Sequence, residues 1–260
     1  MYRGFNLRNI GFNGKELSMA NTYDRLHPIV FKSNIIDSID SFIETEYTFD
    51  GNALINEWFP KLQRPDIFIS HSHDDENLAK ALAMWLEDTF LLTSFIDSTV
   101  WGDFTLLRKK INDYFITKLG SRYDCEQQGR VSQHVMMMLN TSLMEMMDRC
   151  QCLFFLNTPN SISVKEVRNN STYSPWIFSE IGMFNCIEKR KPSDKSLESS
   201  HYKEFANIAY KLDLSQLIEL SADDLNNWQI KCTKITPKTR QSCLDMLYDL
   251  YPLKKMHLKS

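Results

Sequence analysis

Short apolar runs alternate with amphipathic helical patterns through the middle of the chain, and this alternation restricts the fold more than any other feature. The runs DIFIS (66–70), 93–97 and CLFFL (152–156) suit buried strands, and residues 205–212 are a fourth candidate. Strands that alternate with helices pair in parallel and are covered by helices on both faces. The sequence therefore predicts an α/β fold built on a doubly wound parallel sheet.

Helices are predicted between and around these strands. Residues 76–90 place apolar side chains on one helical face, and a proline at the first helical position marks another helix after Ser174. The other expected helices are 34–44, 53–59, 104–119, 131–148, 221–228 and 236–251. We expect a mostly helical N-terminal extension (1–62), an α/β domain (63–215) and a C-terminal helical region packed on that domain (216–260).

The composition excludes several classes of protein. The 260 residues carry a net charge of −3 and include 43% hydrophobic residues, so the chain lacks the basic surface of nucleic-acid-binding proteins. No apolar stretch approaches the roughly 18 residues of a membrane span or resembles a signal peptide. We therefore expect a cytoplasmic protein with neither nucleic acid nor a membrane as partner. The six cysteines form no CxxC pair and the eight glycines form no phosphate-binding motif.

The segment ISHSHDDE (69–76) has two interpretations. Its two histidines and Asp75 match most of the HxHxDH motif with which metallo-β-lactamase-like hydrolases begin their zinc site, but Glu76 replaces the last histidine. Alternatively, Ser72 and Asp75 have the spacing of a helix capping box. The zinc interpretation agrees poorly with the few glycines and the alternating strands and helices, because that fold needs glycine-rich turns between antiparallel strands.

Trp176 and Glu180 lie four positions apart in the helix that begins after Ser174, so their side chains project from one face. This helix follows the loop that leaves the central strand, and doubly wound sheets bind ligands outside the carboxyl ends of their strands. The ends of the first two strands, 70–75 and 97–103, should form the neighbouring walls. The sequence thus predicts one crevice that gathers three segments, although a core tryptophan and a surface glutamate remain the alternative interpretation.

Residues 64–190 resemble the Toll/interleukin-1 receptor (TIR) domain family. The matching segments, in order, are DIFISHSHDDE, ENLAKALAMWLEDTF, SFIDSTVW, CLFFLNTPNSI and YSPWIFSE, and the WxxxE pattern from Trp176 to Glu180 carries most of the resemblance. The resemblance implies a flavodoxin-like doubly wound sheet, here with N-terminal and C-terminal helical additions. It points to the bacterial, NAD-consuming antiphage-defence type (Thoeris-like). The stretch 98–150 departs from the family because it is longer than a compact TIR domain needs.

For the enzymatic members of this family, the resemblance implies cleavage of the bond between nicotinamide and ribose in NAD, by an NAD glycohydrolase or ADP-ribosyl cyclase. Glu180 would be the catalytic residue, because a carboxylate stabilises the oxocarbenium ion that develops as neutral nicotinamide leaves. The implied substrate-binding residues are Trp176, Ser70, His71, Asp97 and Trp101. NAD is then a substrate, and neither a cofactor nor a metal is expected. The resemblance also implies self-association through TIR contacts and a downstream effector that senses the nucleotide product in antiphage immunity.

Two other functions stay open. The chain could be a non-enzymatic TIR interaction or adaptor module, although such modules often lack the glutamate found here at Glu180. A zinc-dependent, metallo-β-lactamase-like hydrolase would need further histidines, for which His134, His201 and His257 are available. The sequence does not distinguish ADP-ribose, a cyclic isomer or a conjugate as the product. It also offers no obvious partner for the pyrophosphate, since basic runs such as 108–110 are usually solvated.

Overall fold

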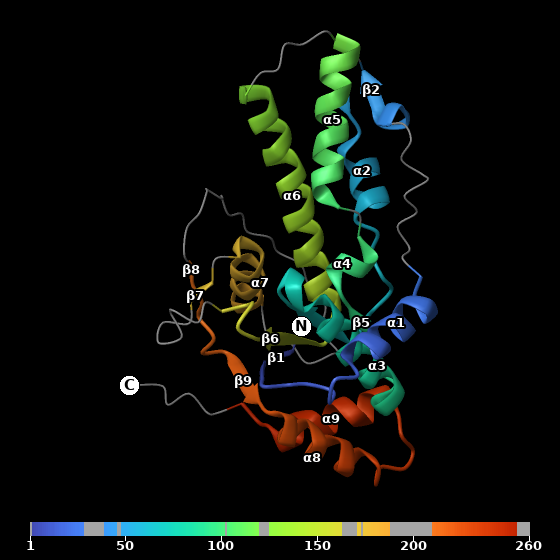
Figure 1. Cartoon of the computed structure of the whole chain (residues 1–260), viewed down its shortest axis with the longest axis vertical. Coiled ribbons are helices and arrows are strands. Elements are labelled where there is room, and N and C mark those ends of the chain that lie inside the picture. The colour runs from blue at the N-terminus through green and yellow to red at the C-terminus, as the bar shows by residue number, and fades with distance from the viewer. Residues whose placement is uncertain are drawn as a thin grey trace.

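A parallel five-stranded sheet forms the centre of the computed structural model (Figure 1). The structure describes residues 2–28, 39–45, 48–101, 103–119, 125–162, 171–172, 174–187 and 210–253. The strands of the sheet are β1 (Arg3–Arg8), β4 (Ile67–Ser70), β5 (Ser94–Phe95), β6 (Cys152–Asn157) and β9 (Leu217–Leu220). They lie in the order β5-β4-β6-β1-β9, and each neighbouring pair is parallel. The predicted α/β class with a parallel sheet is confirmed.

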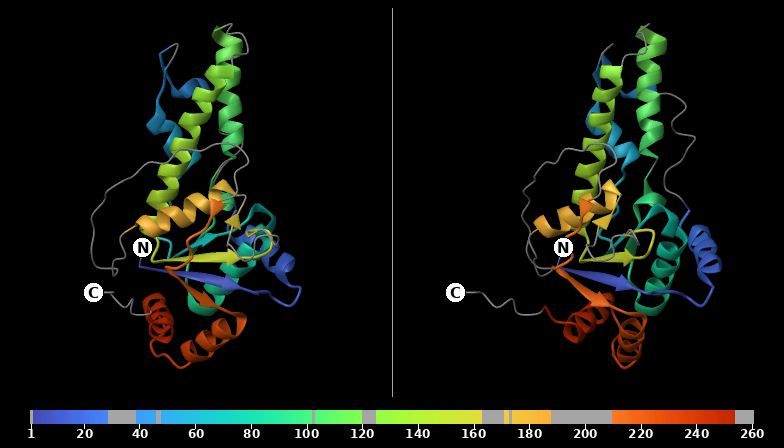
Figure 2. Two further views of the ribbon diagram at one scale, coloured as in Figure 1. Left: turned by 90° about the vertical axis from the view of Figure 1, so that its left-hand side faces the viewer. Right: turned by 60° about the vertical axis from the view of Figure 1, so that its left-hand side comes forward.

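Helices cover both faces of the sheet, because the strand side chains alternate between two apolar layers. In β4, Ile67 and Ile69 join one buried cluster and Phe68 joins the other. The first layer contains α1 (Glu16–Leu26), α3 (Glu76–Phe90), α8 (Ala222–Cys232) and α9 (Arg240–Leu250). The second layer contains α2 (Gly51–Trp58), α5 (Phe104–Leu119), α6 (Cys125–Arg149) and α7 (Pro175–Cys186). Figure 2 shows α8 and α9 on one side of the sheet and α6 and α7 on the other.

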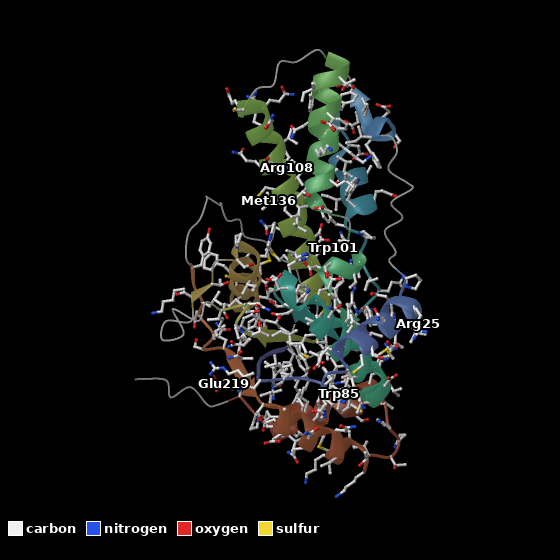
Figure 3. All side chains as sticks on the ribbon, viewed as in Figure 1. Arg25, Trp85, Trp101, Arg108, Met136 and Glu219 are labelled. Carbon is white, nitrogen blue, oxygen red and sulfur yellow. The ribbon has the colours of Figure 1, made fainter. Side chains whose placement is uncertain are left out.

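Trp228 of α8 lies at the centre of the first layer. It is fully buried and stacks on Phe90 of α3 with a centroid distance of 3.7 Å. Its indole N–H donates to the carbonyl oxygen of Cys243 in α9 over 2.9 Å. Trp85, labelled in Figure 3, meets Trp228 edge to face at 6.2 Å. These contacts attach α8 and α9 to α3, and so to the sheet.

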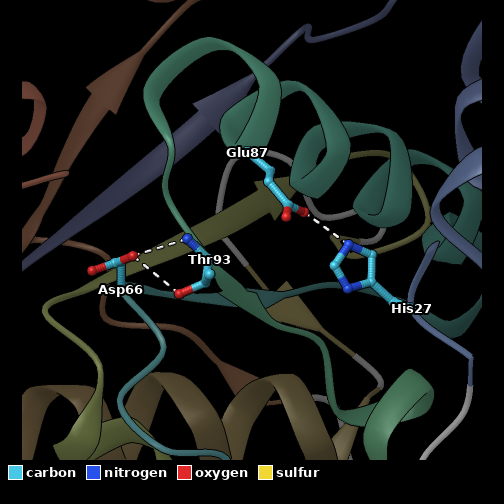
Figure 4. A network of polar contacts seen from close by, with 4 residues as sticks. All are labelled: His27, Asp66, Glu87 and Thr93. Atoms are coloured by element: carbon cyan, nitrogen blue, oxygen red, sulfur yellow. Dashed lines mark hydrogen bonds and ion pairs between the residues drawn. The ribbon is translucent and has the colours of Figure 1, made fainter. Parts of the chain in front are cut away.

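Asp66 joins the amino ends of three neighbouring strands. Its carboxylate accepts hydrogen bonds from the backbone N–H and the hydroxyl of Thr93, at 2.9 and 3.0 Å (Figure 4). Its carbonyl oxygen accepts from the backbone N–H of Gln151, just before β6. Figure 4 also shows His27, after α1, bonded to Glu87 of α3 at 2.8 Å. Both contacts lie away from the carboxyl ends of the strands, which they leave available for a site.

Helices α5 and α6 form a hairpin that projects from the sheet, here called the helical arm (Figures 1 and 2). A small antiparallel pair, β2 (Ile43–Thr45) and β3 (Thr48–Phe49), packs beside it, because Phe49 contacts the rings of Tyr114 and Phe115 edge to face. The arm accounts for the length of the stretch between β5 and β6. In the part of the chain that the structure describes, no helix is both long and apolar enough to cross a membrane.

Strand β1 is the main difference from the sequence-based expectation. The sequence predicts a mostly helical extension there, but residues 3–8 form a strand between β6 and β9, inside the sheet. Polar Arg3, Asn6 and Arg8 interrupt the apolar pattern of this strand, so the strand is not apparent from the sequence. Likewise, β9 belongs to the sheet, although a helical region was expected over 216–260.

Three smaller expectations also need correction. The predicted strand 205–212 does not join the main sheet: β8 (Tyr210–Lys211) pairs antiparallel with β7 (Ser171–Thr172), and residues 205–209 lie outside the described residues. The predicted helix 34–44 lies partly outside them, and its described part is the 3-10 helix η2 (Ile39–Phe42) followed by β2. Helix α1 was not predicted; only Ala20 and Tyr23 of this helix are buried, and most of its other residues are polar.

We expect Gly4→Ala to destabilise the fold, because the side chain of Phe184 in α7 packs directly against Gly4 of β1. A Cβ atom there would overlap the side chains of Phe184 and Leu217, and overpacking of this kind costs about 1–3 kcal/mol. Denaturant titration measures the change in the free energy of unfolding. Gly129→Ala is the control, because a Cβ at this position in α6 meets nothing within 4 Å and should stabilise the helix by about 0.5–1 kcal/mol. Native stability in Gly4→Ala would contradict this packing.

Candidate functional site

Ser70 and Glu180 form a buried hydrogen bond at the carboxyl end of β4. Ser70 ends that strand, and its side chain faces α7 because it lies two positions after Phe68. Glu180 lies in α7, whose first turn is capped by the side chain of Ser174. The Ser70 hydroxyl donates to Glu180 Oε2 over 2.5 Å, and the two residues are 0% and 4% exposed. The first predicted strand and the predicted WxxxE helix therefore meet directly.

The environment of Glu180 favours its neutral form. Burial raises the pKa of this carboxyl well above its ordinary value, and the negative charge of Asp97 raises the pKa further. The hydrogen bond from Ser70 opposes this shift, because it stabilises the carboxylate. A strongly perturbed carboxyl with a defined charge partner is typical of functional sites, although buried structural acids can behave in the same way.

The Ser70–Glu180 pair lies where the order of the strands changes direction. From β4 the chain passes to β5 on one side and then to β6 on the other. Doubly wound sheets bind ligands at such a point, outside the carboxyl ends of the strands. Asp97 begins the short helix α4 (Asp97–Val100) directly after β5, and α7 follows β6. The structure thus brings Ser70, Asp97 and Glu180 to one edge of the sheet, as the sequence predicts.

Asp75 ties the loop after β4 to the loop after β6. Its buried carboxylate accepts hydrogen bonds from Thr158 Oγ1 at 2.5 Å, Asn160 Nδ2 at 2.8 Å and Ser161 Oγ at 3.5 Å. The predicted capping box is therefore wrong, because neither Ser72 nor Asp75 makes a side-chain cap at the 3-10 helix η3 (His73–Asp75) or at α3. Asp75 instead holds together the two loops that border the Ser70–Glu180 pair.

His71 and Trp176 belong to the two segments that carry Ser70 and Glu180. His71 is half-buried, and its Nδ1 lies 3.3 Å from the carbonyl oxygen of Ile69. Trp176 is half-buried and meets Phe104 edge to face at 5.0 Å, which joins the start of α7 to the base of the helical arm. A substrate contact by either residue stays a prediction. The contact with Phe104 accounts for the position of the Trp176 ring.

Trp101 is packed into the apolar layer at the base of the helical arm (Figure 3). It is 6% exposed, and its ring meets Phe59 and Phe95 edge to face. Its indole N–H donates to the carbonyl oxygen of Pro60 over 2.9 Å. These contacts give Trp101 a packing role, and its predicted contact with substrate stays a prediction.

The histidines that prompted the zinc interpretation do not gather in the described part of the chain. Among the described residues, no group of three or more histidine, cysteine, aspartate or glutamate side chains could hold a metal ion. His73 and His134 are exposed, the latter on α6. His201 and His257 lie outside the described residues.

Asn6 of β1 is a polar residue of this region that the sequence analysis did not identify. It is 1% exposed, and its Oδ1 accepts no hydrogen bond from the residues that the structure describes. Asn6 is paired with Phe155 of β6, which is also the partner of Ser70. The only hint in the sequence is a single asparagine within the segment GFNL. This asparagine becomes informative only when residues 3–8 are known to form a strand.

Comparison of the chain with models of protein families, with curated proteins and with solved structures finds no match. Function must therefore be inferred from the chemistry of the site. The features available for that inference are the buried Ser70–Glu180 pair, the nearby Asp97 and their position at the carboxyl edge of the sheet.

We expect native stability, relative to Glu180→Gln, to fall as the pH rises. An acid whose pKa is raised by folding stabilises the fold fully below its unfolded pKa, here 4.5, and this contribution is lost as the pH rises through the folded pKa. Glutamine cannot ionise, so the variant should gain stability over the native protein as the pH rises above 4.5. Denaturant titrations across this range measure the difference.

The control for this measurement is Glu219→Gln. Glu219 is 65% exposed and pairs with Arg8 on the surface at 3.0 Å, so its stability difference from the native protein should stay below about 1 kcal/mol at every pH. A stability difference between native protein and Glu180→Gln that does not change with pH would show that the Glu180 carboxyl has an ordinary pKa.

Proposed function

We propose that this protein is an NAD-cleaving enzyme of the TIR type, either an NAD glycohydrolase or an ADP-ribosyl cyclase, with Glu180 as its catalytic carboxylate. The observation that carries the proposal is the buried hydrogen bond between Ser70 and Glu180 at the carboxyl end of β4. The resemblance assigns Glu180 to catalysis and Ser70 to substrate binding. Catalysis and substrate binding at one site require Glu180 and Ser70 to be neighbours, and their side chains are hydrogen-bonded to each other.

The arrangement of three strands supports a TIR-like interpretation of the sheet. A flavodoxin-like sheet has the strand order 2-1-3-4-5. Strands β5, β4 and β6 have the relative order 2-1-3, and α7 follows the third of them. The N-terminal strand β1 lies beside β6, where a flavodoxin-like sheet has its fourth strand. The proposed TIR-like unit therefore uses a strand from the start of the chain in place of a later one.

The proposed reaction needs one negative charge in a water-poor site. The bond between the ribose C1′ and the pyridinium nitrogen breaks, its electron pair stays with nicotinamide, and the sugar becomes an oxocarbenium ion. Water, which loses a proton, or a nucleophilic atom of the same nucleotide then bonds to C1′ and gives ADP-ribose or a cyclic product. Nicotinamide leaves as a neutral molecule, so no acid has to protonate it. The Glu180 carboxylate would stabilise the positive charge that moves onto the sugar, and low solvent exposure would strengthen this interaction.

The high pKa of Glu180 fits a cationic substrate. Without ligand, burial and Asp97 favour the protonated carboxyl. The pyridinium ring of NAD carries a positive charge, and a positive charge beside a carboxyl lowers its pKa. Substrate binding would thus ionise Glu180 at the moment when the charge is needed, while the Ser70 hydroxyl holds one carboxylate oxygen in place.

The biological setting of the proposal comes from the resemblance alone. It includes a cytoplasmic location, self-association through TIR contacts, and a nucleotide signal sensed by an effector or a depletion of NAD in antiphage immunity. The identity of the product is open to direct measurement by mass spectrometry of the nucleotides after reaction.

We expect the native protein to release nicotinamide from NAD and Glu180→Gln to lose at least about 100-fold of that rate, the scale for removal of one electrostatic group in a transition state. Chromatography of the reaction mixture measures nicotinamide, and assays at several protein concentrations allow for self-association. Glu219→Gln, which removes an exposed carboxylate, should retain the native rate. Native activity in Glu180→Gln would remove this residue from the mechanism.

We also expect kcat/KM to rise with pH, with a midpoint above the ordinary pKa of a glutamate. Because the proposed mechanism uses the carboxylate form, kcat/KM should decrease as Glu180 of the free protein becomes protonated. The raised pKa places this decrease above pH 4.5, the ordinary value for a glutamate. A pH profile of kcat/KM, measured within the range where circular dichroism shows the fold intact, tests this point. A profile that stays flat down to pH 4.5 would contradict a raised pKa in the active form.

One observation favours the interaction module as the second candidate function. Glu180 is almost fully buried, and its hydrogen bond to Ser70 can serve to fix α7 against β4. In that case the chain would act through its surface, and purified protein would release no nicotinamide at any concentration. Loss of stability in Ser70→Ala, without catalytic activity in the native protein, would support this alternative.

A further inference from the structure

The side chain of Asn6 points toward α7, on the same face of the sheet as Ser70. Its neighbours Phe5 and Leu7 join the opposite apolar layer, so Asn6 must face the layer that contains α7. Gly4 lies two positions earlier on the same face, and a Cβ there would meet Phe184 of α7. Asn6 therefore lies on the face of the sheet against which the helix that carries Glu180 packs.

Asn6 and Ser70 lie in one row across the sheet. Both residues are register partners of Phe155, Asn6 from β1 and Ser70 from β4. Two strand spacings separate them, a distance of roughly 10 Å between their Cα atoms. Glu180 lies one helical turn from Phe184, toward the carboxyl end of the sheet where it bonds Ser70. The row therefore contains two buried polar side chains on the α7 face of the sheet, one on each side of Phe155.

The difference between the two polar side chains is that Ser70 is bonded and Asn6 is not. Asn6 is 1% exposed, and its Oδ1 accepts no hydrogen bond from the described residues. Buried polar atoms in folded proteins are nearly always paired, and an unpaired acceptor destabilises the fold. An apolar residue would stabilise this interior strand better, so packing within the chain does not explain why position 6 is an asparagine.

We propose that Asn6 is a ligand-binding residue of this site, and that its carbonyl oxygen accepts a hydrogen bond from a hydroxyl of the adenosine ribose of NAD. This inference rests on the proposed function. A carbonyl acceptor needs a donor, and between the reacting ribose and the adenine ring of NAD the donors are the hydroxyls of the adenosine ribose. Glu180 would face the reacting ribose over β4, so a group roughly 10 Å away across β6 meets the other end of the ligand. The site would then extend from β4 across β6 to β1.

Asn6→Leu tests the proposal, because leucine has a similar volume and no acceptor. We expect KM for NAD to rise about tenfold, the effect of losing one hydrogen bond made equally in the bound substrate and the transition state, with kcat unchanged. The dissociation constant of NAD for Glu180→Gln, measured by calorimetry with and without Asn6→Leu, should change by the same factor. Removal of an unpaired buried acceptor should leave Tm without ligand unchanged or raise it by about 2–4 °C.

Analogues of NAD that lack the 2′ or the 3′ hydroxyl of the adenosine ribose identify the bonded group without relying on a variant. The native protein should bind one of them about tenfold more weakly than NAD, and Asn6→Leu should bind that analogue and NAD equally. Asn185→Leu is the matched control: Asn185 also has an unpaired Oδ1, but it lies in the last turn of α7, beyond Phe184. It should retain the native KM.

Three outcomes have distinct meanings. An increase in KM in Asn6→Leu, with Tm maintained and discrimination against the deoxy analogue lost, supports the ligand role. A native KM in Asn6→Leu, or equal binding of NAD and both deoxy analogues by the native protein, overturns it and leaves the role of Glu180 intact. A native protein that neither binds nor cleaves NAD overturns the proposed function itself, and this inference with it.

Discussion

The hydrogen bond between Ser70 and Glu180 is the contact on which the site depends. It joins the end of a central strand to a helix that begins about a hundred residues later, and it does so away from water. A carboxyl group in such a place is either neutral or compensated by a nearby positive charge. Here the chain supplies a hydroxyl and a second carboxylate, Asp97, but no cation is among the causes that shift the Glu180 pKa. This imbalance is what makes a cationic ligand the natural complement of the site.

Elements whose sequence pattern is local were predicted well. The helix expected over 76–90 has the same limits as α3, because its apolar positions recur at helical spacing and polar residues precede its start. The helix after Ser174 begins where serine and proline predict it. The run CLFFL lies in β6, because five apolar residues in succession suit a strand that is buried on both faces. Together with the strand expected at 66–70, these elements led to the expectation that Glu180 and the end of β4 share one edge of the sheet.

Features that depend on distant partners were not accessible in the same way. Strand β1 mixes polar and apolar residues, and it is a strand because β6 and β9 bond it on both sides. Asp75 fits a local capping pattern, yet its side chain turns to Thr158 and Asn160, whose loop lies beside it only in the folded chain. The unpaired oxygen of Asn6 likewise has meaning only when the row that it shares with Ser70 is known. Sequence patterns report which side chains prefer burial, but not which of them become neighbours.

The interior position of β1 bears on how the protein reaches its fold. Gly4 has Leu153 as one register partner and Leu217 as the other, so β1 cannot be paired on both sides until the chain has been synthesised through β9. Pairing of residues so far apart requires closure of very long loops, which slows folding. Until β9 arrives, one side of β1 exposes unbonded N–H and C=O groups, an edge at which chains can pair wrongly. Strand β9 therefore protects an edge of β1 that stays open while the chain between the two strands is synthesised.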